Sequence, residues 1–313
     1  MKIIFIGTSK FAAIILEKLI GSTNQPFLVI SAPDKAVGRK QIITPPPVAV
    51  LARKHNIPLA QPKKIAEAME EIKKLSPDLI ILAAYGQIIP EAILTIPKYG
   101  SINVHPSLLP LWRGASPIQY AILNGDKKTG VSIMRMTAGL DEGPIILQEE
   151  MVLTGQEYFS ELHDKLAEMA SELLNKAISN IFSGQVSLQL QDNSLASYSK
   201  ILTKEDGRIN WQKPAQAIER QIRALAVWPS SYTFFNDKGK SKRIKIIEAE
   251  THKSIDGKEY SIGQVLNLSP DKIGVQCGQD LLVINKLQVE GKQEITIADF
   301  LRGYPNFVGA ILK

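Results

Sequence analysis

Residues 101–110, about a third of the way along the chain, read SINVHPSLLP and give the clearest indication of the fold. Residues 101–104 predict a short apolar strand that breaks at Pro106. Asn103 and His105 alternate along this run, so their side chains share one face. Continuous apolar strands between helices are typical of a parallel sheet that is covered on both faces. Ligands of such sheets bind beyond the carboxyl ends of the strands, where we expect these two polar residues to lie.

The segments on either side of this stretch alternate between strand and helix patterns. Apolar runs predict strands, and runs with apolar residues three and four apart predict helices. The expected strands are residues 2–6, 27–31, 79–84, 101–104 and 131–136. The expected helices are residues 11–20, 48–55, 65–75, 116–123 and 158–182. Together they predict an α/β domain with a Rossmann-like parallel sheet at residues 1–186.

The composition changes after this first domain. The residues that follow are rich in Gln, Ser and Asn with weak periodicity, and we expect a linker at residues 187–206. A helix pattern returns at residues 214–225. Short strands between turn residues are then expected at residues 232–235, 243–250, 263–268, 272–276 and 280–287. Such a series predicts a small C-terminal β-barrel at residues 207–313.

Composition excludes several classes of protein. The chain has 313 residues, 44% of them hydrophobic and 22% charged, which fits a soluble globular protein of two domains. No apolar run approaches the roughly 18 residues that a membrane span needs. The first apolar run is too short for a signal peptide, so we expect a cytoplasmic protein with no membrane partner.

One cysteine, Cys277, rules out a disulfide within the chain and fits a reducing compartment. It lies in a strand-like run, and we expect it to be a small core residue rather than a nucleophile. The net charge of +6 suits a polyanionic partner, but a solvated lysine-rich surface would give the same value.

A second polar group follows the strand expected at residues 131–136. Asp141 lies in the run 137–143, whose glycines allow a close turn that would aim its carboxylate at His105. Acyl transfer to an amine needs a donor for the oxyanion, a proton carrier and a group that orients the carrier. Asn103, His105 and Asp141 can fill these roles in that order. Each alone is typical of a structural residue, and their joint placement at the ends of two strands predicts the site.

Two kinds of cofactor are not indicated. The first turn, Gly7-Thr8-Ser9-Lys10, has only the first glycine of the dinucleotide fingerprint, so we interpret it as sheet architecture. The four histidines are widely scattered and there is one cysteine, which gives no metal-ligand spacing. We therefore expect neither a dinucleotide nor a metal.

Residues 103–110 with Arg113-Gly114, and the run 139–143, resemble the signature of the folate-dependent formyltransferases. That family includes methionyl-tRNA, glycinamide-ribonucleotide and sugar formyltransferases and formyltetrahydrofolate hydrolase. The resemblance implies that Asn103, His105 and Asp141 are catalytic and that 10-formyltetrahydrofolate is the co-substrate. The folate-binding residues that it implies are Ser107, Leu108, Leu109, Pro110, Tyr85 and Ile88.

Other segments resemble the members of this family that act on tRNA, so that the likeness covers essentially the whole chain. These segments include residues 33–48, 85–90, 204–211 and 224–229. In the first, the residue matching Arg39 probes the acceptor end of the tRNA, although a surface loop would have the same composition. The loop here departs from the family pattern, because Gln41-Ile42 stands where lysines are common.

The C-terminal strands resemble a barrel of the oligonucleotide-binding (OB) kind, with a basic run at residues 238–245. That run would contact the tRNA backbone or form a solvated hairpin. The full set of tRNA-binding residues that the resemblance implies is Lys35, Arg39, Lys40, Lys200, Lys204, Lys242 and Arg243.

The expected activity is therefore transfer of a formyl group from 10-formyltetrahydrofolate to the α-amino group of methionyl initiator tRNA, by a monomer. Two alternatives stay open. The acceptor could be a nucleotide-linked amino sugar, or the chain could be a non-catalytic RNA-binding protein on the same scaffold.

Overall fold

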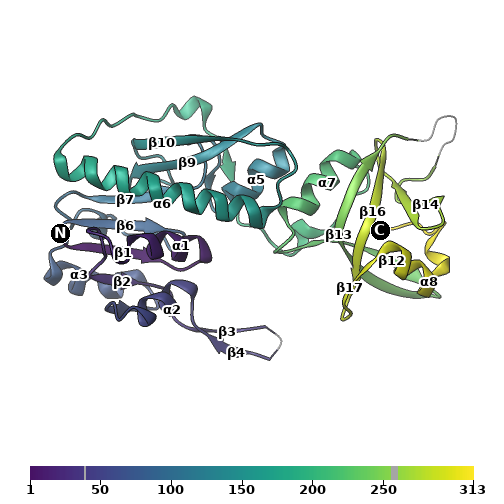
Figure 1. Ribbon diagram of the computed structural model, residues 1–313, viewed down its shortest axis with the longest axis horizontal. Coiled ribbons are helices and arrows are strands. Elements are labelled where there is room, and N and C mark those ends of the chain that lie inside the picture. The colour runs from purple at the N-terminus through teal and green to yellow at the C-terminus, as the bar shows by residue number, and fades with distance from the viewer. Residues whose placement is uncertain (39, 255–259) are drawn as a thin grey trace. The chain divides into compact units, whose positions relative to one another are not determined.

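The computed structural model of the protein describes residues 1–38, 40–254 and 260–313. The chain forms two compact units (Figure 1). The first comprises Met1–Pro117, Lys128–Val152 and Glu161–Lys200, and the second comprises Ile118–Lys127, Leu153–Ser160 and Ile201–Lys313. The domain limits at residues 186 and 207 stay predictions. Within the expected linker, the residues up to Lys200 pack with the first unit and those from Ile201 with the second.

Within the described residues, the first unit is built on a seven-stranded sheet. Its strand order is β10 (Ile145–Val152), β9 (Lys128–Arg135), β7 (Ser101–His105), β6 (Leu79–Ala83), β1 (Ile3–Gly7), β2 (Leu28–Ile30) and β5 (Leu59–Ala60). Strands β5, β2, β1, β6 and β7 run parallel. At one edge of the sheet β9 is antiparallel to β7, and β10 is antiparallel to β9. The mostly parallel sheet confirms the predicted fold class. The expectation that the strand at residues 131–136 belongs to a parallel sheet was wrong, because β9 is antiparallel to β7.

Helices cover both faces of this sheet, which explains why β1, β6 and β7 are buried at every residue. The even-numbered side chains of β1 and β6 pack against Ile72 and Ile93. These belong to α3 (Met69–Leu75) and α4 (Glu91–Leu94), and the 3₁₀ turn Ile65–Ala68 leads into α3. The other face receives α1 (Lys10–Leu19): a Cβ on Gly7 would lie 2.7 Å from the Cβ of Ala12. Gly7 therefore serves close packing of helix on strand, as the sequence suggested.

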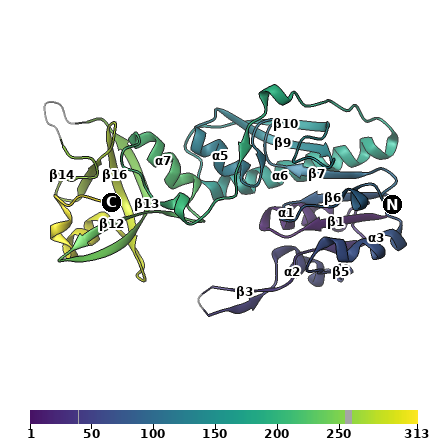
Figure 2. The same cartoon turned by 180° about the vertical axis from the view of Figure 1, so that it is seen from behind.

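Two further helices complete the first unit. Helix α2 (Pro47–Lys54) packs beside α1. The long helix α6 (Phe159–Ser183) joins α1 through an ion pair in which Lys10 Nζ lies 2.7 Å from an Asp164 carboxylate oxygen. Between β2 and α2, the hairpin of β3 (Lys35–Val37) and β4 (Ile42–Thr44) extends from the unit, and all its strand residues are exposed (Figure 2). The sequence predicted a loop here, not strands.

The second unit is an antiparallel sheet with a helix at each end of its sequence. Helix α7 (Ala215–Ala224) precedes it, and α8 (Ile297–Gly303) follows it. The strand order is β12 (Ser231–Asp237), β13 (Lys240–His252), β16 (Leu281–Val289), β15 (Lys272–Gln276) and β14 (Val265–Ser269), with β17 (Glu294–Thr296) beside β16. Helix α5 (Pro117–Asn124) packs largely with this unit.

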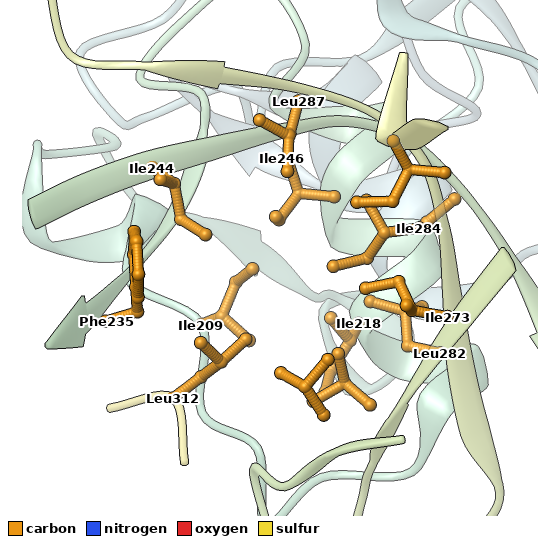
Figure 3. Packing of buried hydrophobic residues seen from close by; sticks show 14 of the residues in the cluster. Ile209, Ile218, Phe235, Ile244, Ile246, Ile273, Leu282, Ile284, Leu287 and Leu312 are labelled. Carbon is orange, nitrogen blue, oxygen red and sulfur yellow. The ribbon is translucent and has the colours of Figure 1, made fainter. Parts of the chain in front are cut away.

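The last residues of the chain close this sheet into a barrel. Leu312 N–H donates to Gly263 O at 2.9 Å beside β14, and Lys313 exchanges two hydrogen bonds of 3.0 Å with Phe234 of β12. The interior is apolar and includes Ile218 of α7 and Leu312 itself (Figure 3). A bulge in β13 near Glu248 bends that long strand around the core. The predicted C-terminal barrel is thus present.

Candidate active site

Strand β7 carries the first two residues of the predicted site. Asn103 lies between Leu82 of β6 and Met134 of β9 in the sheet, and His105 lies opposite Ser132 of β9. Both side chains are almost fully buried, with 8% of Asn103 and 4% of His105 exposed. Groups this buried act in a low dielectric, where hydrogen bonds and charges count for more than in water.

Asp141 reaches the same place by a route that differs from the predicted one. Since β9 is antiparallel to β7, its last residue, Arg135, lies beside Ile102 at the start of β7. The following loop must therefore run back along the sheet before it presents Asp141. The expectation that two strands end at the same edge was wrong, although the side chains do meet.

The three side chains lie in contact range of one another. The amide Nδ2 of Asn103 donates to Asp141 Oδ1 at 3.3 Å. The other carboxylate oxygen accepts the Gly114 N–H at 2.8 Å and lies 3.7 Å from His105 Nδ1. One carboxylate therefore connects the amide and the imidazole.

The hydrogen bonding of His105 decides which of its ring nitrogens can exchange a proton. Nε2 lies 3.0 Å from the Trp112 carbonyl oxygen, which can only accept, so Nε2 carries a hydrogen and donates. In the neutral ring Nδ1 is then the basic nitrogen, and it faces Asp141. The carboxylate can stabilise the imidazolium that forms when Nδ1 takes up a proton. Asn103 has a second amide N–H, which can serve a developing oxyanion.

The loop after His105 is held by hydrogen bonds to β9 and β10. The predicted folate residues of this loop are Ser107, Leu108, Leu109 and Pro110. Ser132 Oγ donates to Ser107 O at 2.7 Å and accepts the Leu109 N–H at 3.1 Å, while Gln148 Nε2 donates to Leu109 O at 3.0 Å. Ser107 and Leu109 are buried, and none of the four lines the pocket described next. Their contact with folate stays a prediction.

A pocket of about 170 Å³ opens at Asp141, and neither Asn103 nor His105 is among its lining residues. Its wall includes Asp141 and also Leu82 and Met134, the two residues that flank Asn103 in the sheet. Ile88, which was predicted for folate, lines it as well and is 88% exposed. The remaining lining residues are Gln87, Ile89, Met136, Thr137, Ala138, Gly139 and Leu140. Leu82, Met134 and Met136 were not predicted, because their only signal was a position near strand ends next to the polar residues.

Tyr85, the other predicted folate residue, is 5% exposed and packs in the core on the α3 side of the sheet. Its hydroxyl is buried and has no hydrogen-bond partner among the residues that the structure describes. Burial, followed by the negative charge of Glu67, raises the pKa of Tyr85. The phenol therefore stays neutral and could offer a hydrogen bond to a bound molecule.

The predicted tRNA residues fall into two groups. In the first unit, Lys35 and Lys40 lie on the exposed β3–β4 hairpin. Lys200, the last residue of this unit, is also exposed. Arg39 lies outside the described residues. In the second unit, Lys204 is exposed.

Lys242 and Arg243 are neighbours on β13 and are already engaged within the second unit. Lys242 Nζ lies 2.6 Å from Asp237, and that hydrogen bond raises the pKa of Lys242. The Arg243 guanidinium stacks 3.7 Å from the centre of the Tyr232 ring. A contact of Lys242 with a phosphate would therefore compete with its ion pair to Asp237.

Across residues 1–38, 40–254 and 260–313, no three His, Cys, Asp or Glu side chains gather in a way that could hold a metal ion. In the same part of the chain, no helix has the length and apolarity to span a bilayer.

Two family models match the chain. One described as formyl transferase matches residues 1–178, and one described as formyl transferase, C-terminal domain, matches residues 201–305. Among curated relatives, the methionyl-tRNA formyltransferase of Citrifermentans bemidjiense is 41% identical over 100% of this chain and 96% of its own length. That of Alkaliphilus oremlandii is also 41% identical, over 100% of this chain and 99% of its own.

Solved structures share the fold. An N-formyltransferase from Helicobacter canadensis, in complex with folinic acid and dTDP-3-aminofucose, has a TM-score of 0.67 and is 19% identical, covering 94% of this chain and 100% of its own. HypX from Aquifex aeolicus, in complex with tetrahydrofolic acid, has a TM-score of 0.62 and is 16% identical, covering 98% of this chain and 48% of its own.

Proposed function

The chain belongs to the methionyl-tRNA formyltransferase family, and from this premise we propose that it transfers a formyl group from 10-formyltetrahydrofolate to the α-amino group of methionyl initiator tRNA. The observation that carries the proposal is the convergence of Asn103 and His105 on Asp141, whose side chain also lines a pocket. The reaction belongs to translation initiation in the cytoplasm.

The geometry supports direct attack by the amine. The amine nitrogen forms a bond to the formyl carbon, the bond from that carbon to the folate nitrogen breaks, and one proton moves from the amine to the departing nitrogen. The free N–H of Asn103 would stabilise the oxyanion of the tetrahedral intermediate. Nδ1 of His105 would take the proton from the amine and pass it to the departing folate nitrogen, with Asp141 stabilising the imidazolium. The reaction then requires no covalent intermediate on the protein.

The pocket supports a folate as the formyl donor. Its apolar wall of Leu82, Met134, Met136 and Leu140 suits a flat ring system, and Gln87 adds a polar group. Its volume of about 170 Å³ is below the roughly 300–1,000 Å³ of sites that enclose a whole small-molecule ligand. We propose that the ring end of the folate enters this pocket and the rest extends across the surface.

The acceptor is tested by an initial-rate assay of the purified full chain with 10-formyltetrahydrofolate. We expect rapid formylation of charged initiator methionyl-tRNA, and slower formylation of charged elongator methionyl-tRNA. A nucleotide-linked amino sugar serves as the third acceptor, because proteins with this fold include one solved with dTDP-3-aminofucose.

Transfer to the sugar alone would replace the proposed acceptor. No transfer to any of the three acceptors, with tRNA still bound, would favour a non-catalytic RNA-binding protein.

A further inference from the structure

We infer that Gln191 is a positioning residue for formyl transfer: its side-chain amide holds the loop that presents Asp141. The inference rests on the proposed function, because it concerns the orientation of a residue in that reaction. Gln191 lies in the segment between the two family matches, which the sequence analysis treated as a linker.

The amide of Gln191 bridges two parts of the site. Its Nε2 donates to the carbonyl oxygen of Asp141 at 2.8 Å and to that of Gly143 at 2.7 Å. Its Oε1 accepts from Arg113 Nε at 3.1 Å and from Arg113 Nη2 at 2.8 Å. Both N–H groups and the oxygen of the amide are thus engaged.

Arg113 determines which way this amide points. A guanidinium can only donate, so the oxygen of Gln191 must face Arg113 and its nitrogen must face the two carbonyls. Arg113 is 2% exposed, and its Nη2 also donates to Asn193 Oδ1 at 2.7 Å. The guanidinium is therefore fixed by the protein interior, and it fixes Gln191 in turn.

Asp141 needs such support because of its backbone conformation. Its φ is 51°, in the left-handed region that favours glycine and strains most other residues. Neighbouring residues of the loop, Ala138, Leu140 and Glu142, are exposed and offer little packing. Gln191 holds the Asp141 carbonyl on one side, while Gly114 holds its carboxylate on the other. Together they set the direction of the carboxylate towards Asn103 and His105.

The segment that carries Gln191 is itself anchored on both sides. Gln189 and Ile145 exchange backbone hydrogen bonds of 2.8 and 2.9 Å before it. After it, β11 (Tyr198–Ser199) pairs with β8 (Arg113–Gly114). Gln191 therefore has a fixed position between two pairings and can act as a support rather than as a mobile linker residue.

The test compares three variants of the full chain with the wild type in the methionyl-tRNA formylation assay. Gln191→Glu keeps the length and the acceptor for Arg113 but replaces two donors with a carboxylate oxygen. Gln191→Ala removes the bridge. Gln189→Glu, two residues earlier on an exposed side chain, is the matched control. Tetrahydrofolate binding and the thermal midpoint are measured for each.

We expect kcat of both Gln191 variants to fall roughly ten- to hundredfold, as for other small displacements of reacting groups. KM for methionyl-tRNA should stay within about threefold of wild type, because it is the transition-state arrangement around the amine that changes. The Kd for tetrahydrofolate should rise less than kcat falls, since residues 137–141 of the same loop line the proposed folate pocket. Gln189→Glu should match the wild type.

Unchanged kcat in Gln191→Glu and Gln191→Ala, with an active wild type, would overturn the inference. A joint loss of kcat, folate binding and thermal stability would also overturn it, since it would show a purely structural role. An inactive wild type would instead overturn the proposed function, and this inference with it.

Discussion

At the scale of single residues, the site is a short chain of hydrogen bonds around one carboxylate. Asp141 accepts from the amide of Asn103 and from the backbone of Gly114, and it lies beside Nδ1 of His105. The Trp112 carbonyl holds the other ring nitrogen as a donor. The orientations of His105 and Asp141 therefore depend on the backbone of Trp112 and Gly114, which take no part in the proposed chemistry.

A first prediction about a single residue concerns Arg39 and its expected contact with tRNA. If it probes the acceptor end of the tRNA, Arg39→Ala should lower kcat/KM for methionyl-tRNA by roughly ten- to a hundredfold, because a charged contact to phosphate or base is lost. Tetrahydrofolate affinity should not change. Lys73→Ala, which removes an exposed cation of α3, is the control. Equal rates for Arg39→Ala and wild type would remove Arg39 from the tRNA-binding set.

Cys277 gives a second residue-level prediction. The thiol is 1% exposed, and burial raises the pKa of Cys277 to about 12. The thiolate is the reactive form, so at pH 8 the native protein should not react with iodoacetamide over hours. One thiol per chain should react in denaturant, as mass spectrometry would show. Labelling of the native protein at the rate of a free thiol would contradict the core position.

At the level of elements, Gly114 of β8 connects Asp141, which accepts its N–H, to strand β11, which pairs with β8. Its φ is +107°, and an added Cβ would lie 2.4 Å from the Ser199 carbonyl oxygen. Gly114→Ala should therefore cost about 1–3 kcal/mol of stability from backbone strain alone, and more from the clash. Turnover should fall with it, because the N–H that binds Asp141 would move.

The matched control for Gly114 is Gly184→Ala. Gly184 also has a positive φ, +73°, but nothing lies within 4 Å of the added Cβ. Urea unfolding should show a smaller loss for this variant, and its turnover should be unchanged. Equal losses of stability in the two variants, with normal turnover in both, would show that the Gly114–Ser199 approach does not shape the site.

The elements also show what sequence alone could and could not predict. Apolar runs identified β1, β6 and β7 because these strands are buried on both faces, where periodicity is simple. Strand β10 was missed, since it has a polar, half-exposed sequence at the sheet edge. The direction of β9 could not be predicted, because strand direction depends on a connection that a short pattern does not encode. For the same reason, the predicted route of the chain from the strand at residues 131–136 to Asp141, beside His105, was wrong.

The support around the site was harder to predict than the site. Asn103, His105 and Asp141 are chemically distinctive and stand in a recognisable pattern. Gln191 lies 50 residues from Asp141 in a polar segment with no periodicity, and only the fold brings the two together. Hydrogen bonds over such separations leave no local signal.

At the scale of the whole molecule, the net charge of +6 is part of the proposed function. A tRNA that is held mainly through its phosphates releases counterions on binding. We expect its affinity to fall about a hundredfold between roughly 50 and 200 mM salt if about four phosphates are contacted.

Folate binding is the internal control for this salt dependence, since the pocket wall is largely apolar. Its Kd should change little over the same range, by isothermal calorimetry of the full chain. A tRNA affinity that is independent of salt would mean that the basic residues of the two units do not bind the phosphate backbone.

The most direct test of the account is the single-turnover rate of formyl transfer to methionyl-tRNA in His105→Ala, compared with wild type and with His55→Ala, an exposed histidine at the end of α2. We expect His105→Ala to be slower by about two orders of magnitude or more, with tetrahydrofolate and tRNA still bound and the fold intact. His55→Ala should match the wild type. A near-normal rate in His105→Ala would contradict the claim that this imidazole, oriented by Asp141 beside Asn103, carries the proton in the transfer.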